Sequence, residues 1–117
     1  MTQTGMLGNR AEKLAHKYLR KQGLTSLAQN YHCRYGEIDL VMRDNDYLVF
    51  VEVRYRKNQN YGGAIESVDR FKQAKLRRSA ESYLLKSKNH DCPCRFDILC
   101  ITGNLNKPEL DWIKNAF

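Results

Sequence analysis

Residues 36–56 read GEIDLVMRDNDYLVFVEVRYR, in which apolar and polar side chains alternate on both sides of Asn45-Asp46. Alternation over this length indicates two β-strands with one face buried, and Asn and Asp tolerate the positive φ of a tight hairpin turn. Counting outward from this turn gives the register. It predicts one wholly apolar face, on which the facing pairs are Ile38 with Val53, Leu40 with Val51, and Met42 with Val49.

The other face of the hairpin places Asp39 opposite Glu52 and Glu37 opposite Arg54. Facing residues of an antiparallel pair have Cβ atoms roughly 5 Å apart, so two carboxylates there repel each other unless one is protonated or a cation lies between them. Hard oxygen ligands suit Mg²⁺ or Mn²⁺. We therefore hypothesise a divalent-metal site at Asp39 and Glu52. A register shifted by two residues keeps both faces but separates this pair diagonally.

The composition favours a polyanionic partner. The chain has 117 residues, enough for one domain with a single core, and a formal charge of +7. Much of this charge is local, because residues 54–78 contain eight basic and two acidic side chains. The basic segment begins directly after the two carboxylates, so we expect nucleic acid to bind beside them.

No part of the sequence indicates secretion or a membrane segment. The first residues, MTQTGMLGNRAEK, lack the apolar core of a signal peptide, and no apolar run is long enough to span a bilayer. We expect a cytoplasmic protein whose four cysteines are reduced. A zinc site is the alternative for Cys92-Pro-Cys94, near His90 and with His32 or Cys33, although a one-residue gap is not the usual ligand spacing.

Periodicity predicts the remaining elements. Helical spacing of apolar residues indicates a first helix from about Leu7 to Gln22, ended by Gly23. A second helix is expected from Val68 or Asp69 to Leu85, with Ser67 or Asp69 as its N-cap. Further strands are expected at residues 24–34, 95–102 and 109–113. Residues 57–64, KNQNYGGA, are expected to form a mobile loop.

Three polar side chains of these elements have more than one interpretation. Glu12 lies at the margin of the apolar stripe, so its carboxylate faces either the sheet edge or solvent. Gln73 projects into the apolar arc of the second helix, where it either contributes to a site or bonds a neighbouring backbone group. Asp97 alternates with apolar residues and is expected to be structural, paired with Arg95 or with a basic residue of a helix.

Several motifs resemble a known nuclease superfamily. Glu12 on a helix, Gly36-Glu37-Ile38-Asp39 and Glu52-Val53-Arg54 on strands, and Lys72-Gln73 on a basic helix resemble the PD-(D/E)xK superfamily, and archaeal-type Holliday junction resolvases in shape. The segments GEIDLV, VFVEVRYR, YGGA, ESV, CRFDI and DWIKNAF resemble more closely the bacterial YraN-like family of predicted endonucleases. The resemblance covers nearly the whole chain. It implies one restriction-endonuclease-like α/β domain over residues 1–117, with a mixed sheet of about five strands flanked by helices.

The resemblance also implies roles for particular residues. Glu12, Asp39 and Glu52 match the acidic positions that bind Mg²⁺ or Mn²⁺. Arg54 stands where the superfamily has lysine; arginine keeps the charge but does not lose its proton near neutral pH, so it clamps the scissile phosphate rather than acting as a base. The implied catalytic residues are therefore Asp39, Glu52, Arg54 and Glu12. The expected nucleic-acid-binding residues are Arg54, Arg56, Lys57, Lys72, Gln73 and Lys75.

The sequence thus predicts metal-dependent hydrolysis of phosphodiester bonds in DNA, branched or otherwise structured, with recognition of shape rather than sequence. One alternative is a catalytically inactive nucleic-acid-binding protein that retains the nuclease fold; Arg54 favours it and the three retained acids oppose it. Another alternative is a structural or regulatory component of a larger assembly, in which the basic face meets an acidic protein. Junction-resolving relatives act as dimers, which implies a homodimer here.

Overall fold

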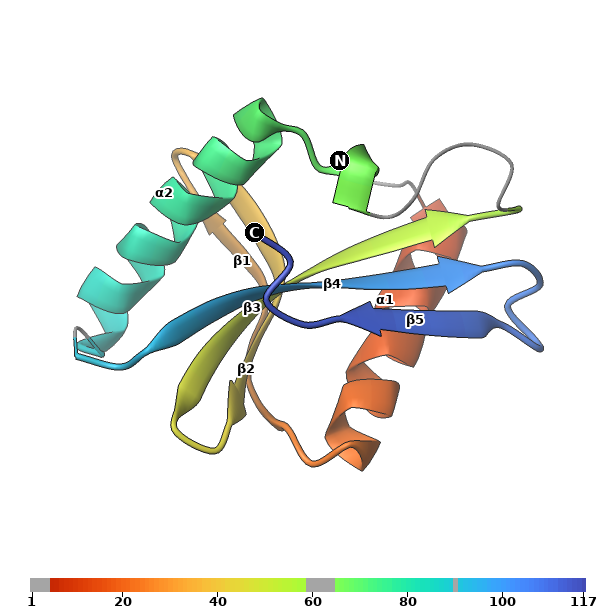
Figure 1. The fold of residues 1–117 in the computed structure, drawn as a ribbon, viewed down its shortest axis with the longest axis horizontal. Helices are drawn as coiled ribbons and strands as arrows, with labels where there is room; N and C mark the ends of the chain where they lie inside the picture. The colour runs from red at the N-terminus through yellow and green to blue at the C-terminus, as the bar shows by residue number, and fades with distance from the viewer. Residues whose placement is uncertain (1–4, 59–64, 90) are drawn as a thin grey trace.

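The computed structural model describes residues 5–58, 65–89 and 91–117. Five strands form one sheet in the order β1-β2-β3-β4-β5, with every neighbouring pair antiparallel except β3 and β4 (Figure 1). The predicted α/β class and mixed sheet are therefore confirmed. The elements are α1 (Gly5–Lys21), β1 (Thr25–Cys33), β2 (Gly36–Asp44), β3 (Tyr47–Arg56), the short 3-10 helix η1 (Ile65–Ser67), α2 (Arg70–Ser87), β4 (Cys94–Thr102) and β5 (Glu109–Ile113).

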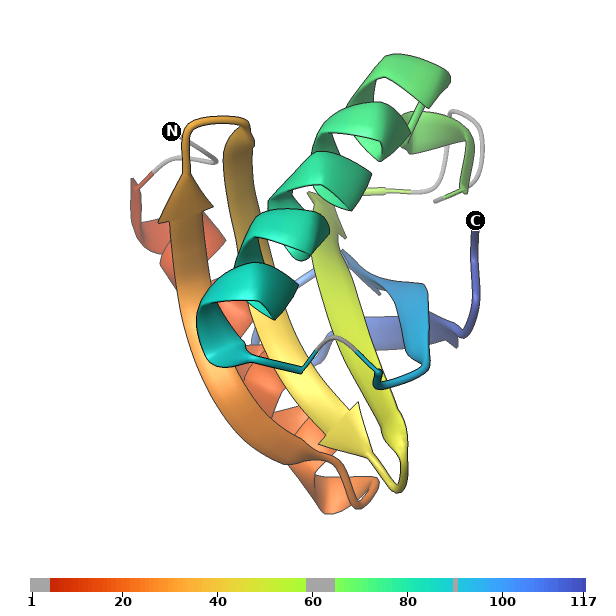
Figure 2. The same cartoon turned by 90° about the vertical axis from the view of Figure 1, so that its left-hand side faces the viewer.

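The two helices cover opposite faces of the sheet. Parallel strands need a crossover connection, and α2 supplies it between β3 and β4. Figure 2 shows α2 in front of the sheet and α1 behind it. One buried cluster joins α1 to the sheet through Ala15, Leu19 and Leu40, and another joins α2 to it through Leu76, Ala80 and Phe50. Within the described residues, neither helix is long and apolar enough to cross a membrane.

The β2–β3 hairpin has the predicted turn and register. Asn45 adopts a positive φ of 56°, and the backbone pairs include Met42 with Val49 and Leu40 with Val51. The observed pairs end at Leu40 with Val51, so the expected backbone pairs of Asp39 with Glu52 and of Glu37 with Arg54 are not among them. This end of the hairpin is where the carboxylates lie.

The prediction that one hairpin face is buried was wrong, because both faces are. Val41, Leu48 and Phe50 are buried under α2, whereas Leu40 and Val51 are buried on the side of α1. Ile38 was expected beside Leu40 but belongs to the cluster under α2. The strand alternation fails around Asp39, opposite a part of β1 where Asn30 has a left-handed φ of 51°.

Local sequence signals fix the helix ends. Gly23, with φ of 103°, follows α1 as predicted. Asp69, rather than Ser67, is the N-cap of α2, where its side chain accepts the backbone N–H of Lys72 at 2.9 Å. At the C-terminus, Phe117 stacks on Phe96 with ring centroids 5.1 Å apart, which packs the chain end onto β4. Residues 59–64, which include most of the loop expected to be mobile, lie outside the described residues.

Candidate metal and nucleic-acid site

Two carboxylates are buried at the end of the β2–β3 ladder. The exposed fraction is 8% for Asp39 and 5% for Glu52. One step beyond the last backbone pair, Asp39 Oδ2 accepts the backbone N–H of Val53 at 2.8 Å. The side chain of Asp39 thus takes a donor that regular pairing would give to the main chain of β2, and this bond fixes the carboxyl group beside β3.

Burial and mutual repulsion raise the pKa of Asp39 to about 8. Burial is the largest cause, since it disfavours the charged form, and the charge of Glu52 is the next. Glu12 adds a smaller effect in the same direction, while the Val53 N–H and Lys72 oppose the shift. At neutral pH, without a cation, the folded protein therefore keeps Asp39 mainly protonated. This is the electrostatic conflict that two converging acids were expected to produce.

Two cations stand beside Glu52. Its Oε2 atom lies 3.5 Å from Lys72 Nζ and 3.6 Å from Arg54 NH1. Arg54 comes from the same strand, whereas Lys72 comes from the first turn of α2, which the Asp69 cap holds in place. The structure therefore brings together Asp39, Glu52, Arg54 and Lys72, four of the residues that the sequence indicated.

Arg54 is anchored on both sides. Its Nε donates to Ser67 Oγ at 3.1 Å and its NH2 group donates to the Ser67 carbonyl oxygen, in addition to the ion pair with Glu52. Ser67 was one of the two expected N-caps, but Asp69 caps the helix and Ser67 holds Arg54 instead. No sequence pattern points to this role, because the two residues meet only when η1 folds back onto β3.

Glu12 of α1 faces this site. Burial raises its pKa, and the nearby charges of Glu37 and Glu52 act in the same direction, while a hydrogen bond from the side chain of Asn30 opposes them. The interpretation of Glu12 as a carboxylate directed toward the sheet therefore holds. Asn30 and Glu37 were not among the predicted site residues. Glu37 lies within the GEIDLV motif, and an asparagine inside a strand is the residue type that accepts a left-handed φ.

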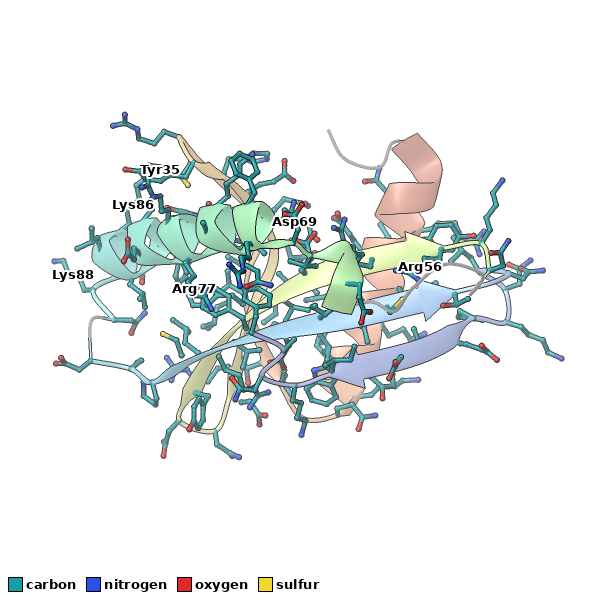
Figure 3. The ribbon with its side chains drawn as sticks, turned by 45° about the horizontal axis from the view of Figure 1, so that its top comes forward. Tyr35, Arg56, Asp69, Arg77, Lys86 and Lys88 are labelled. Atoms are coloured by element: carbon teal, nitrogen blue, oxygen red, sulfur yellow. The ribbon has the colours of Figure 1, made fainter. Side chains whose placement is uncertain are left out.

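The other predicted nucleic-acid residues lie on two elements and the segment after β3: Arg56 ends β3, Lys57 follows it, and Gln73 and Lys75 belong to α2. Gln73 bonds locally, since its Nε2 donates to the Val68 carbonyl at 2.9 Å. Lys57 and Lys75 are exposed. In the view of Figure 3, Asp69 at the start of α2 lies between Arg56 at the end of β3 and Tyr35 at the turn between β1 and β2.

The donor chemistry of the acids fits a hard divalent cation. A cation between Asp39 and Glu52 would offset both the burial and the repulsion that raise the pKa of Asp39, and oxygen is the ligand atom that Mg²⁺ and Mn²⁺ prefer. Among the described residues, however, no group of three acidic, histidine or cysteine side chains is already arranged around a common point. Glu12 would reach such an ion directly after a rearrangement or through water.

Two predicted structural features lie outside this site. Asp97 is fully buried and its Oδ1 accepts Arg95 Nε at 3.0 Å, which agrees with a structural role. Trp112 Nε1 and the backbone N–H of Asn115 also donate to the Asp97 carboxylate, each at 2.9 Å. All four cysteines are free thiols, as expected. His90, which the zinc alternative includes, lies outside the described residues.

A mixed five-stranded sheet with a helix on each face, and acids on two neighbouring strands, defines a restriction-endonuclease-like α/β protein. The chain belongs to the uncharacterised protein family UPF0102, whose model matches residues 11–101; this is the YraN-like family that the motifs indicated.

Three relatives show the extent of the similarity. A UPF0102 protein of Nitrosomonas eutropha is 50% identical over 117 residues, which cover 100% of this chain and 97% of the relative. A Legionella pneumophila protein of the family is 49% identical over 111 residues, with 94% and 92% of the two chains covered. One from Saccharophagus degradans is 50% identical over 111 residues, with 94% and 91% covered. These names state a family and no activity.

Proposed function

We propose that the protein is a metal-dependent endonuclease that hydrolyses phosphodiester bonds in DNA, preferentially in branched or otherwise structured DNA. The observation that carries the proposal is the buried pair Asp39 and Glu52, in which burial and then the charge of Glu52 raise the pKa of Asp39 to about 8, while two cations lie beside Glu52. Such an arrangement costs stability in the free protein, and perturbed acids of this kind are typical of catalytic sites.

Asp39 and Glu52 would hold Mg²⁺ or Mn²⁺, with Glu12 as a third ligand directly or through water. When bound, the ion supplies a Lewis acid for the phosphodiester and for the attacking water. The chain itself excludes solvent from Asp39, orients that carboxyl group through the Val53 N–H, and supplies positive charge for a phosphate.

Lys72 and Arg54 have different surroundings and therefore different proposed roles. Arg54 is held by both Ser67 and Glu52, so it mainly orients Glu52 and η1 and presents its remaining donors to a phosphate. The Lys72 ammonium pairs with Glu52 at 3.5 Å, and the Lys72 side chain is 39% exposed. We propose that Lys72 is the cation that contacts the scissile phosphate. Arg56, Lys57 and Lys75 would contact the neighbouring phosphates.

The test is a cleavage panel. Branched, single-stranded and duplex DNA, together with RNA, are incubated with Mg²⁺ or Mn²⁺ and wild-type protein, Asp39→Ala or Glu52→Ala. Cleavage of at least one DNA substrate is expected, with its loss in both variants. Asp46→Ala, at the exposed hairpin turn, is the matched control and should cleave like the wild type. Equal cleavage by wild type and both site variants would show contamination and reject the proposal.

A second candidate is a nucleic-acid-binding protein without catalysis. It is favoured by the anchoring of Arg54 on Ser67 and by the lack of a preformed three-ligand group among the described residues. Salt-dependent binding of DNA together with no cleavage under either metal would select it. Binding that persists in Asp39→Ala without cleavage in the wild type would point the same way.

Location and assembly are part of the proposal. A nuclease acting on chromosomal DNA works where that DNA is, so we place the protein in the cytoplasm. The resemblance to junction resolvases supports a homodimer, since a dimer presents two sites to the two strands of a branched substrate. Sedimentation or light scattering of the protein with and without branched DNA measures this directly.

A further inference from the structure

Phe71 is the most exposed large apolar side chain among the described residues, with 74% of its surface exposed. It is the second residue of α2, directly before Lys72. The Asp69 cap fixes the backbone of this first turn, so the Cα–Cβ bond of Phe71 leaves the helix at a defined place. A single exposed apolar ring is ordinary on a protein surface, so the residues around Phe71 decide whether it has a role.

Cations surround Phe71 and a second aromatic residue. Lys75 Nζ lies 5.4 Å from the ring centroid of Phe71, and the guanidinium carbons of Arg34 and Arg78 lie 5.4 and 5.7 Å from that of Tyr35. These residues are contiguous, because the Lys75 side chain also reaches the turn at Gly36, where its Cε atom comes within 3.9 Å of the position of an added Cβ. We call Arg34, Tyr35, Phe71, Lys75 and Arg78 the aromatic strip.

The aromatic strip adjoins the proposed catalytic site at two points. Phe71 precedes Lys72, which pairs with Glu52, and the Tyr35-Gly36 turn precedes Glu37, whose charge acts on Glu12. Figures 1 and 2 show the start of α2 and the turn between β1 and β2 at the same end of the molecule. Phe71 and Lys72 share the first turn of α2, so an extended ligand bound at Lys72 and Glu52 would pass close to Phe71.

The charge of the aromatic strip indicates which kind of ligand binds there. It contains three cations and no acid, so a second copy of the chain placed on it would bring like charges together, whereas a polyanion would be attracted. Among polyanions, single-stranded nucleic acid combines phosphates with flat aromatic bases that stack on protein rings. In a duplex these base faces are covered by neighbouring base pairs, so only unpaired nucleotides present them.

We propose that Phe71 stacks on an unpaired nucleobase, with Lys75 and Arg78 beside the flanking phosphates, so that the substrate carries unpaired nucleotides next to the scissile bond. The position of the scissile bond rests on the proposed nuclease function, but the stacking itself does not. The single-strand junction at a flap, bulge or branch point fits both sites at once.

The experiment measures binding without metal, in EDTA, so that cleavage plays no part. Fluorescence anisotropy gives the affinity of full-length protein for single-stranded, flapped and fully paired DNA, and 2-aminopurine at the unpaired position reports stacking. Phe71→Ala should lower the affinity for single-stranded and flapped DNA by about tenfold, which is the effect of losing one base stack. The affinity for duplex DNA should change less than twofold. Phe71→Trp should restore both the affinity for unpaired DNA and the quenching of 2-aminopurine fluorescence that stacking causes.

Leu85→Ala is the matched control, because Leu85 is 66% exposed on the same helix but lies near its other end. It should bind like the wild type. Equal losses of affinity for single-stranded and duplex DNA in Phe71→Ala, or no loss at all, would overturn the inference. A change of oligomeric mass in Phe71→Ala would also overturn it, because it would show a protein interface. If the protein cleaves no DNA but Phe71 still quenches 2-aminopurine fluorescence, only the nuclease function is rejected.

Discussion

Asp39 and Val53 are joined by a hydrogen bond from a backbone N–H to a side-chain oxygen at the point where the pairing of β2 with β3 ends. The bond anchors a carboxyl group that burial and Glu52 keep protonated up to about pH 8. Asp39 is therefore both a structural contact of the hairpin and a carboxyl group whose charge changes near neutral pH.

Stability should fall as the pH rises toward 8. The pKa of an unfolded Asp is about 4, whereas that of folded Asp39 is about 8. The contribution of protonated Asp39 to the free energy of unfolding is therefore fully present below pH 4 and is lost as the pH rises through the folded pKa. Asp39→Asn keeps an acceptor for Val53 and removes this loss. Urea denaturation at acidic, neutral and alkaline pH should show a free energy of unfolding that falls less in the variant. Parallel curves of unfolding free energy against pH for the wild type and Asp39→Asn would contradict the raised pKa of Asp39.

Mg²⁺ or Mn²⁺ should stabilise the wild-type protein near pH 7.5. A cation that binds only the folded state raises the melting temperature, and here it also replaces the proton on Asp39. Thermal unfolding with and without metal is the measurement. An increase of a few degrees is expected in the wild type and none in Asp39→Asn or Glu52→Gln. An equal increase in all three proteins would place the ion elsewhere.

Removal of the buried Asp97 carboxylate should destabilise the fold without acting on the site. Arg95, Trp112 and the Asn115 backbone all donate to it, so Asp97→Ala leaves several buried donors unpaired. We expect a loss of about 3–5 kcal/mol in the free energy of unfolding. Asp111→Ala, at an exposed position of β5, should change it by less than about 0.5 kcal/mol. Similar values for the two variants would be the contrary result.

If the protein cleaves DNA, Lys72 should affect turnover more than binding. Lys72→Ala removes the cation nearest Glu52, so we expect kcat to fall by about 10²-fold with a small change in KM. Lys72→Arg should restore part of the activity because it keeps the charge. Lys86→Ala, an exposed cation in the last turn of α2, is the control. A change confined to KM would assign Lys72 to binding alone.

Binding of DNA should weaken steeply with salt, because phosphate contacts release counterions. Lys57→Ala, at an exposed position next to β3, should lower the affinity for all sequences alike and reduce the slope of log affinity against log salt by about one. Titrations at several salt concentrations measure both effects. An unchanged slope would place Lys57 outside the interface.

The sequence predicted what is local. The hairpin register near the turn followed from Asn45 and from the alternation around it, and the cap of α2 was narrowed to Ser67 or Asp69, of which Asp69 is the cap. The same alternation misplaced Ile38, because a side-chain bond and the left-handed φ of Asn30 interrupt the regular pattern. Such a bond leaves no trace in periodicity.

Contacts between distant segments were beyond sequence patterns alone. Ser67 meets Arg54, and Trp112 meets Asp97, only in the folded chain. The hairpin register alone paired Asp39 with Glu52, whereas Glu12, Arg54 and Lys72 joined them only through the family resemblance, which already contains the result of folding. The exposure of Phe71 was not foreseeable, because helical spacing does not distinguish an open ring from one packed against a neighbour.

The parallel pairing of β3 with β4 has a consequence for the order of folding. The β2–β3 hairpin closes over a short turn, whereas Leu48 meets Cys94 only after the whole crossover has formed. Asp39 and Glu52 therefore come together early, and the ammonium of Lys72 arrives later with the crossover. A chain cut between β3 and α2 would keep Asp39 and Glu52 together without the Lys72 ammonium, so the proposed site is complete only when the crossover has packed.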